Sequence, residues 1–162
     1  MLPELLAANS AYAAAFTKGD LPSPPRCRLA ILTCMDSRIM PSKMLGLVEG
    51  DAHVIRNAGG RATGDAMRSL ILSYKVLGTR EFLVVHHTDC GMERINNDDF
   101  RQELQESSGA ATAHLDFMPI ADLLQAIRDD VTTIRNSPYI PRDISISGLL
   151  YDVKTGRLEQ VV

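Results

Sequence analysis

The chain has 162 residues, a length that suits one domain with a substantial core and is short for two independent domains. It is 45% hydrophobic and 23% charged, with a formal net charge of −3, and its basic residues are scattered among acids, which excludes the basic stripe that binds nucleic acid. No apolar stretch approaches the ~20 residues that span a bilayer, so we expect neither nucleic acid nor membrane as a partner.

Cysteine usage indicates a reducing compartment. The chain has three cysteines, an odd number that does not make a disulfide framework in a domain of this size. Glu4 places an acidic residue where a signal peptide would carry positive charge. We therefore expect a cytoplasmic protein in which some cysteines have a metal-binding or catalytic role.

The first 20 residues predict a helical arm. Residues 2–18 carry apolar side chains at helical spacing, and Gly19 is the expected stop. These side chains are Leu2, Leu5, Leu6, Ala13 and Phe16. A proline-rich linker follows at 21–25, so the arm either packs on its own domain or swings away to pack on a second subunit.

Strands and helices then alternate along the chain. Apolar runs predict strands at about 28–33, 51–56 and 81–86, with a helix over 63–77 that ends at Gly78. Pro41 favours a short helix after the first strand. Near-continuous apolar strands that alternate with helices indicate a parallel sheet with helices on both faces.

The last third of the chain adds a long helix and an edge strand. Residues 91–115 are polar and only loosely helical, whereas 120–134 carry a clear helical stripe. Residues 144–153 predict a strand, and a tight turn joins it to a final edge strand at 158–162. The predicted fold is one α/β domain over 1–162, with a mainly parallel sheet and an antiparallel edge strand.

Two predicted strands end in reactive side chains. The first runs into Cys34, Asp36 and Arg38, and the third runs into His87 and Cys90. Ligands of open α/β sheets bind beyond the carboxyl ends of the strands, so we expect the two clusters to converge. Two thiolates and one imidazole suit zinc, and three protein ligands leave a fourth tetrahedral position for water.

The other histidines and the third cysteine are expected to be structural. His86 neighbours His87 and must face the opposite way along a strand, so we expect it to be packed or hydrogen-bonded. His53 and Cys27 receive the same interpretation, and His114 is expected in an exposed loop. The alternative for the cysteines of the two clusters is that they are small buried hydrophobic residues.

Asp36 and Arg38 are the candidate catalytic residues. Two thiolates cancel the charge of zinc and weaken it as a Lewis acid, so a bound water needs help to ionise. Asp36 can only accept a hydrogen bond and would orient that water, while Arg38 would pair with Asp36 bidentately. The alternative is a loop ion pair of small energetic value.

Three glycines are weaker candidates for the site. Gly59, Gly60 and Gly91 follow the predicted strands and the second cluster. They are either turn glycines or positions that let backbone amides approach the substrate.

These motifs resemble the β-class carbonic anhydrases, in particular their compact bacterial members. The matching segments, in the order and spacing of the family, are Cys34-x-Asp36-Ser37-Arg38, Arg56-Asn57-Ala58-Gly59 and His87-x-x-Cys90-Gly91. The ending Gly148-x-x-Tyr151-Asp152-Val153-x-Thr155-Gly156 is also similar to the last strands of the family. The resemblance runs from about residue 28 to the end of the chain.

The resemblance implies a function. One Zn²⁺ per subunit would be held by Cys34, His87 and Cys90, and zinc hydroxide would attack carbon dioxide to give bicarbonate and a proton. Asp36 and Arg38 would form the catalytic dyad, although in some members the dyad opens and the aspartate takes the fourth zinc position. The pocket of the family lies at a dimer interface, which implies a homodimer or homotetramer and gives the arm a partner.

Alternative functions share parts of this interpretation. The aromatic and glutamine residues that line the pocket of plant-type members have no obvious counterparts, and some relatives with the same ligands hydrolyse carbon disulfide or carbonyl sulfide. A non-catalytic zinc-binding module would use a fourth protein ligand, plausibly Asp36. A thiol-redox protein is the weakest alternative because no Cys-x-x-Cys pair exists.

Overall fold

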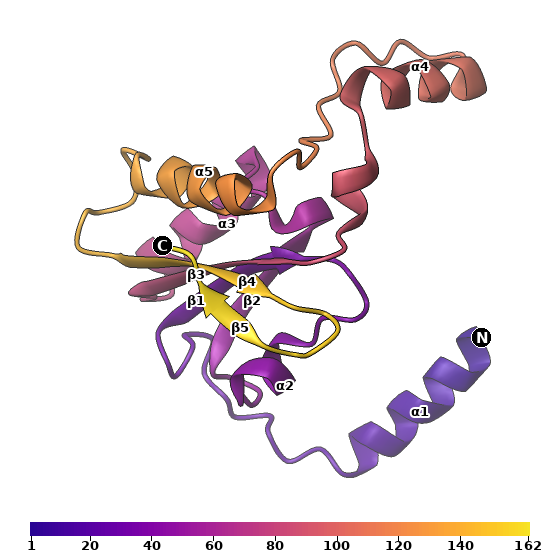
Figure 1. Cartoon of the computed structure of the whole chain (residues 1–162). Coiled ribbons are helices and arrows are strands. Elements are labelled where there is room, and N and C mark those ends of the chain that lie inside the picture. Colours follow the sequence, from indigo (N-terminus) through magenta and orange to yellow (C-terminus); the bar gives the residue numbers. More distant parts are fainter.

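A five-stranded sheet forms the centre of the structure, a computed structural model that describes residues 1–162 (Figure 1). The strands are β1 (Leu29–Cys34), β2 (Ala52–Asn57), β3 (Glu81–His87), β4 (Ser145–Tyr151) and β5 (Leu158–Gln160). Their order is β2-β1-β3-β4-β5, and only the β4–β5 pair is antiparallel. The predicted mainly parallel sheet with an antiparallel edge strand is confirmed.

Helices lie on both faces of the sheet, as predicted. They are α1 (Leu2–Ala14), α2 (Pro41–Leu45), α3 (Gly64–Lys75), α4 (Asn97–Ser108) and α5 (Leu123–Arg135), with short 3-10 turns η1 (Ala58–Gly60) and η2 (Gly91–Arg94). Figure 1 shows α3 and α5 together over one face and the short α2 on the other. All six positions of β1 are buried, because both of its faces are covered, which explains its continuous apolar run.

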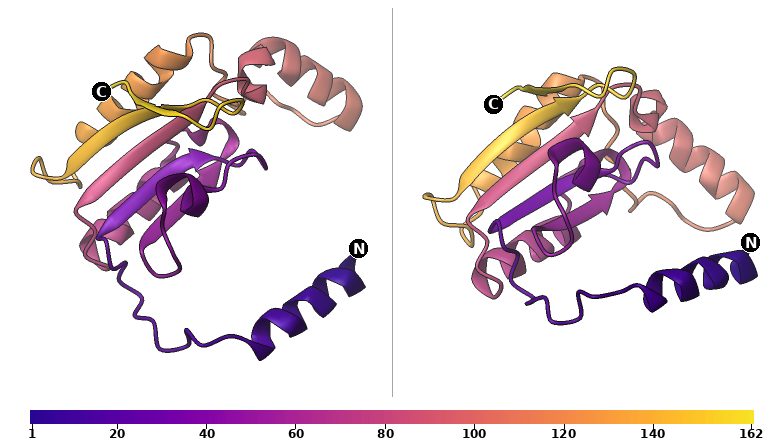
Figure 2. Two further views of the ribbon diagram at one scale, coloured as in Figure 1. Left: turned by 60° about the horizontal axis from the view of Figure 1, so that its bottom comes forward. Right: turned by 90° about the horizontal axis from the view of Figure 1, so that it is seen from below.

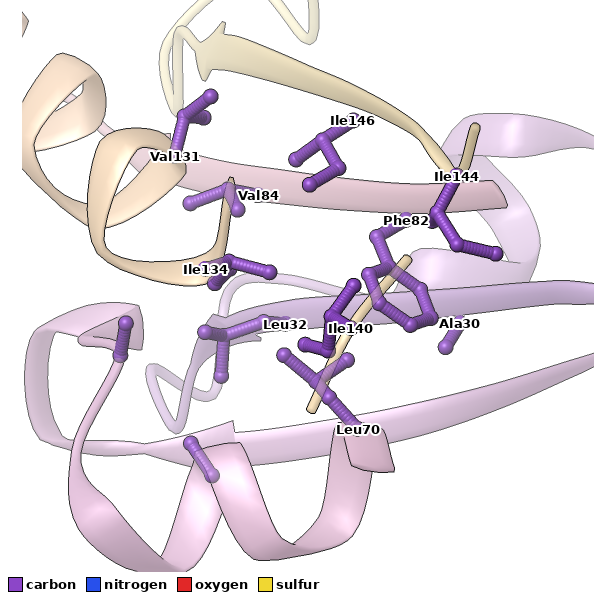
Figure 3. Close-up of a cluster of buried hydrophobic side chains, with 12 residues drawn as sticks. Ala30, Leu32, Leu70, Phe82, Val84, Val131, Ile134, Ile140, Ile144 and Ile146 are labelled. Carbon is purple, nitrogen blue, oxygen red and sulfur yellow. The ribbon is translucent and has the colours of Figure 1, made fainter. Parts of the chain in front are cut away.

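The main core lies between the sheet and the pair α3 and α5. Alternate residues of the strands point into it, among them Leu32 and Phe82, and meet Leu70 of α3 and Val131 of α5 (Figure 3). A smaller cluster on the other face contains Ile31 and Val85 and packs against α2. The central strands are therefore fixed from both sides.

The register of β1 and β3 places the two reactive clusters at one edge of the sheet. The strands pair in parallel up to Thr33 and Val85, and the Thr33 hydroxyl donates to the carbonyl oxygen of Val85 at 2.8 Å. Cys34 and His87 end their strands just beyond this pair. The convergence of Cys34 and His87 therefore follows from strand pairing.

The N-terminal arm contacts its own chain only near its end. No residue of α1 is buried, and both figures show the helix projecting away from the sheet (Figures 1 and 2). The helix ends at Ala14, earlier than the predicted Lys18, and Tyr12 and Lys18 both bind the carboxylate of Glu49. Packing on its own domain, one of the two expectations, is not seen, and partner packing stays a prediction.

The segment predicted as only loosely helical contains a regular helix. Helix α4 is capped at both ends: the side chain of Asn96 accepts from the backbone N–H groups of Asp98 and Asp99, and Gly109 follows the helix in the left-handed conformation. None of its residues is buried, which explains why the sequence lacks a strong apolar stripe there. No helix in the structure has the length and apolar character required to cross a membrane.

Candidate metal centre

Three metal-binding side chains meet beyond the ends of β1 and β3. The Sγ atoms of Cys34 and Cys90 and a ring nitrogen of His87 all lie within 4.8 Å of one another, and the three residues are buried. Cys34 and His87 are supplied by the strands, and Cys90 by the turn before η2. The structure thus brings the three predicted ligands together.

The hydrogen bonding of this cluster fits a zinc ion. His87 Nδ1 lies 2.9 Å from the carbonyl oxygen of Thr88, which can only accept, so the proton belongs on Nδ1. His87 Nε2 is then a bare acceptor, and it is buried without any hydrogen-bond partner. A buried atom of this kind is costly unless a ligand satisfies it, and a metal ion supplies that ligand.

The two thiols also favour a cation. The hydrogen bond from Cys90 lowers the pKa of Cys34 to about 4, although burial opposes this shift. The resulting Cys34 thiolate in turn raises the pKa of Cys90. Cys34 also raises the pKa of His87 against the opposing effect of burial. The two sulfurs lie close enough to bind one cation, which would hold both of them as thiolates.

Asp36 and Arg38 form an ion pair beside the cluster. Arg38 donates from Nε to Asp36 Oδ1 at 3.0 Å and from Nη2 to Asp36 Oδ2 at 2.7 Å, which is the bidentate arrangement. These bonds hold the pKa of the Asp36 carboxyl well below its usual range, and the carboxylate raises the pKa of Arg38. Asp36 Oδ2 lies 3.8 Å from His87 Nε2, so the ionised carboxylate stands beside the ligand cluster.

Arg56 fixes the backbone that carries the dyad. Its side chain donates from Nε to the carbonyl oxygen of Cys34 at 2.9 Å and from Nη2 to that of Asp36 at 2.6 Å. Arg56 lies on the neighbouring strand β2. The backbone of the loop between Cys34 and Arg38 is therefore anchored to the sheet.

One of the predicted glycines is required by a close approach. Gly60 has φ of +72°, and a Cβ added there would lie 2.9 Å from the backbone nitrogen of Cys34. Its lack of a side chain lets η1 pack against the end of β1. Gly59 also has a positive φ of +77°, whereas Gly91 follows Cys90 and has open space where a Cβ would lie.

A buried ion pair behind the centre was not predicted. Arg61 donates from Nε to Asp130 Oδ2 at 2.8 Å, and the backbone N–H of Ala62 donates to Asp130 Oδ1 at 3.0 Å. His86 Nε2 lies 3.0 Å from Asp130 Oδ2 but outside hydrogen-bond geometry. Because Asp130 belongs to α5, this pair ties the helix to the loop beside Gly60.

The structure also places the residues expected to be structural. His86 is fully buried, as expected, and His114 lies in an exposed loop. His53 is half-buried, and its Nδ1 lies 2.7 Å from the hydroxyl of Ser73. The expectation that Cys27 is packed is wrong: Cys27 is exposed, because it lies in the loop before β1 and not in the paired strands.

The sheet is mainly parallel, and its carboxyl edge carries a Cys-His-Cys cluster beside an aspartate–arginine pair. This combination is typical of a zinc enzyme. Residues 29–158 match the family described as "Carbonic anhydrase". Since the match covers most of the chain, the chain belongs to the carbonic anhydrase family, and its cluster places it with the β-class.

Individual relatives agree with this family. The chain is 43% identical to β-carbonic anhydrase 1 of Mycobacterium tuberculosis, over 98% of this chain and 96% of the relative. It is 34% identical to carbon disulfide hydrolase of an Acidianus species, over 85% of this chain and 78% of the relative. The crystal structure of carbonic anhydrase from Streptococcus mutans superposes with a TM-score of 0.95 at 45% identity, covering 99% of this chain and 97% of that chain.

Proposed function

We propose that the protein is a zinc-dependent carbonic anhydrase that interconverts carbon dioxide and bicarbonate. The observation that carries this proposal is the Cys34–His87–Cys90 cluster beside a bidentate Asp36–Arg38 pair, in a chain that belongs to this family. One zinc ion per chain would be held by the three ligands. When bound, it supplies a Lewis acid that lowers the pKa of a water molecule.

The side chain of Asp36 orients the nucleophile in this proposal. An ionised carboxylate only accepts hydrogen bonds, so a water that donates to Asp36 turns its lone pairs toward the carbon of carbon dioxide. The water oxygen forms the new C–O bond, one proton leaves to solvent, and the product is bicarbonate. Arg38 keeps Asp36 ionised and fixes both of its oxygens.

A non-catalytic zinc module is less well supported. Such a site needs a fourth protein ligand, and Asp36 is the carboxylate beside the cluster. Both of its oxygens are bonded to Arg38 instead, which favours a fourth position open to water.

The proposal includes a homodimer or homotetramer. In one chain the side chain of Arg38 is 43% exposed, and Met35 and Met40 next to the dyad are exposed as well. Water screens the interaction between Asp36 and Arg38 at so exposed a site. A second subunit that covers the pair would exclude water and strengthen the interaction. We also place the protein in the cytoplasm, since all three cysteines are free.

Stopped-flow measurement of carbon dioxide hydration on protein of known zinc content tests the proposed reaction. We expect turnover in proportion to bound zinc. Carbon disulfide is the second substrate to compare, because 34% identical relatives are carbon disulfide hydrolases and both molecules are small linear electrophiles. Turnover of carbon disulfide without turnover of carbon dioxide would reassign the substrate and leave the site intact.

The ligand assignment has a separate test. Cys34→Ser replaces a thiolate with a poor zinc ligand, so we expect zinc content, measured by elemental analysis, to fall well below one ion per chain. Cys27→Ser is the matched control because Cys27 is exposed and remote from the cluster. Full zinc occupancy in Cys34→Ser would show that the ligands are assigned incorrectly.

A further inference from the structure

Asp89 lies between two of the metal ligands and is bonded to the catalytic dyad. It stands in the turn that joins His87 to Cys90, and its backbone has φ of +56°. A non-glycine residue in this region is uncommon, although aspartate and asparagine tolerate it better than most. Such a conformation persists only where surrounding contacts enforce it.

The contacts that enforce this conformation come from Arg38. Arg38 donates from Nη1 to Asp89 Oδ2 at 2.8 Å and from Nη2 to the carbonyl oxygen of Asp89 at 2.9 Å. The second carboxylate oxygen of Asp89 accepts from Arg94. Arg38 thus has two partners, since its Nε and Nη2 also hold Asp36.

The turn that carries Asp89 is itself fixed to the sheet. The backbone N–H of Thr88 donates to the carbonyl oxygen of Tyr151 at 2.9 Å, and the N–H of Val153 donates to the Thr88 hydroxyl at 3.2 Å. Asp89 therefore offers Arg38 an anchor on a rigid element. Without its carboxylate, Arg38 would keep only Asp36 and one carbonyl oxygen as acceptors, and its Nη1 would lose its partner.

We infer that Asp89 is a positioning residue that locks Arg38 in place and thereby keeps Asp36 away from the metal. Asp36 Oδ2 is only 3.8 Å from His87 Nε2, and its backbone is anchored by Arg56. Rotation of its side chain is enough to bring the carboxylate toward a bound cation, which attracts it. The lock on Arg38 opposes that rotation.

The decisive variant is Asp89→Asn, tested in the full-length protein. Asparagine keeps the shape and tolerates the positive φ but removes the negative charge that binds Arg38. We expect the variant to retain one metal ion per chain and to lose tenfold or more in kcat. In the cobalt-substituted protein we expect a changed visible absorption spectrum, as Asp36 replaces water at the metal.

Two further variants control this experiment. Asp99→Asn makes the same charge change at an exposed carboxylate that is bonded to neither Arg38 nor Arg94. We expect its cobalt spectrum and kcat to match those of the wild type. If Asp89→Asn does not fold, Asp89→Gly repeats the test, because glycine adopts this φ freely.

The inference rests on the proposed function, but the experiments distinguish a failure of the inference from a failure of the proposed function. A cobalt spectrum of Asp89→Asn identical to that of the wild type would overturn the lock, whatever the activity. Loss of metal from both Asp89 variants would also overturn it, by showing that Asp89 shapes the ligand turn rather than Arg38. A wild type that does not hydrate carbon dioxide would instead reject the proposed function, while the spectral comparison would still decide the inference.

Discussion

At the scale of single residues, the centre separates the candidate metal ligands from Asp36, the side chain that we propose orients water. The ligands are buried and preorganised by short bonds such as that of His87 Nδ1 to Thr88. Asp36 lies beside them with its pKa depressed by Arg38. Its carboxylate is therefore ionised at neutral pH and can accept a hydrogen bond from water.

Substitution of Asp36 tests that role. Asp36→Asn keeps the shape of the side chain but exchanges one acceptor oxygen for a donor, so it no longer enforces one orientation of water. We expect zinc content to be unchanged and kcat/KM for carbon dioxide to fall on the order of a hundredfold or more. Unchanged turnover at full zinc content would remove Asp36 from the mechanism.

The pH dependence of activity should not come from Asp36. A carboxyl whose pKa is depressed loses its charge only when the pH falls below the usual aspartate range. The rise of kcat/KM that we expect between about pH 6 and 9 therefore reflects ionisation of the nucleophilic water. Stopped-flow profiles of the wild type and Asp36→Asn should rise over the same range, and a flat wild-type profile would contradict hydroxide attack.

The metal ligands could be predicted from the sequence, whereas ion pairs between residues far apart in the chain could not. Cys34, His87 and Cys90 could be chosen because strand ends carried them. Asp89 was not singled out, since nothing in the sequence shows which arginine faces it. The Arg61–Asp130 pair spans 69 positions, and no local pattern connects residues so far apart.

At the scale of elements, α5 is coupled to the loop beside the metal centre. The Arg61–Asp130 pair is almost fully buried, with side-chain exposures of 11% and 3%. Arg61 also donates to the carbonyl oxygen of Met118 at 3.1 Å. A movement of α5 would therefore be transmitted to the backbone that packs against Cys34.

Removal of one partner should destabilise the protein. Asp130→Ala leaves the guanidinium of Arg61 and the N–H of Ala62 buried without an acceptor, so we expect the free energy of unfolding to fall by about 3 kcal/mol. Urea denaturation measures this loss. The double variant Arg61→Leu Asp130→Ala should lose less than the sum of the two single variants; additive losses would mean that the two side chains act independently.

Element types were predicted better than element ends. The strands β1 and β3 followed from continuous apolar runs, because both of their faces are covered. Helix α4 was underestimated since it buries no residue and depends on its Asn96 cap. The arm helix ends before the predicted Lys18, and Lys18 instead binds Glu49, a residue far along the chain that no local pattern connects to it.

At the scale of the whole molecule, the single chain leaves apolar surface unused. Helix α1 exposes Leu2, Leu5 and Leu6, which have no partner in their own chain. They line one side of the helix at three- and four-residue spacing. This surface favours the proposed assembly, in which the arm packs on a neighbouring subunit.

Charge placed on this surface should break the assembly. We expect the double variant Leu5→Glu Leu6→Glu to run as a monomer in analytical ultracentrifugation and to lose most of its activity, because its dyad stays open to water. Ala7→Glu with Ala11→Glu adds the same charge to the opposite side of the same helix and is the control. A dimer in the first variant would show that the arm does not form the interface.

The strand order has a consequence for folding. Strands β1 and β3 are neighbours in the sheet, but β2 and α3 lie between them in the chain, so the three donors meet only after a complete crossover has formed. An unfolded chain has no such site, and zinc binding and folding are therefore linked equilibria. By mass action, free zinc at a thousandfold its Kd adds about 4 kcal/mol to the free energy of unfolding. The ion would thus stabilise the sheet topology that creates its own binding site.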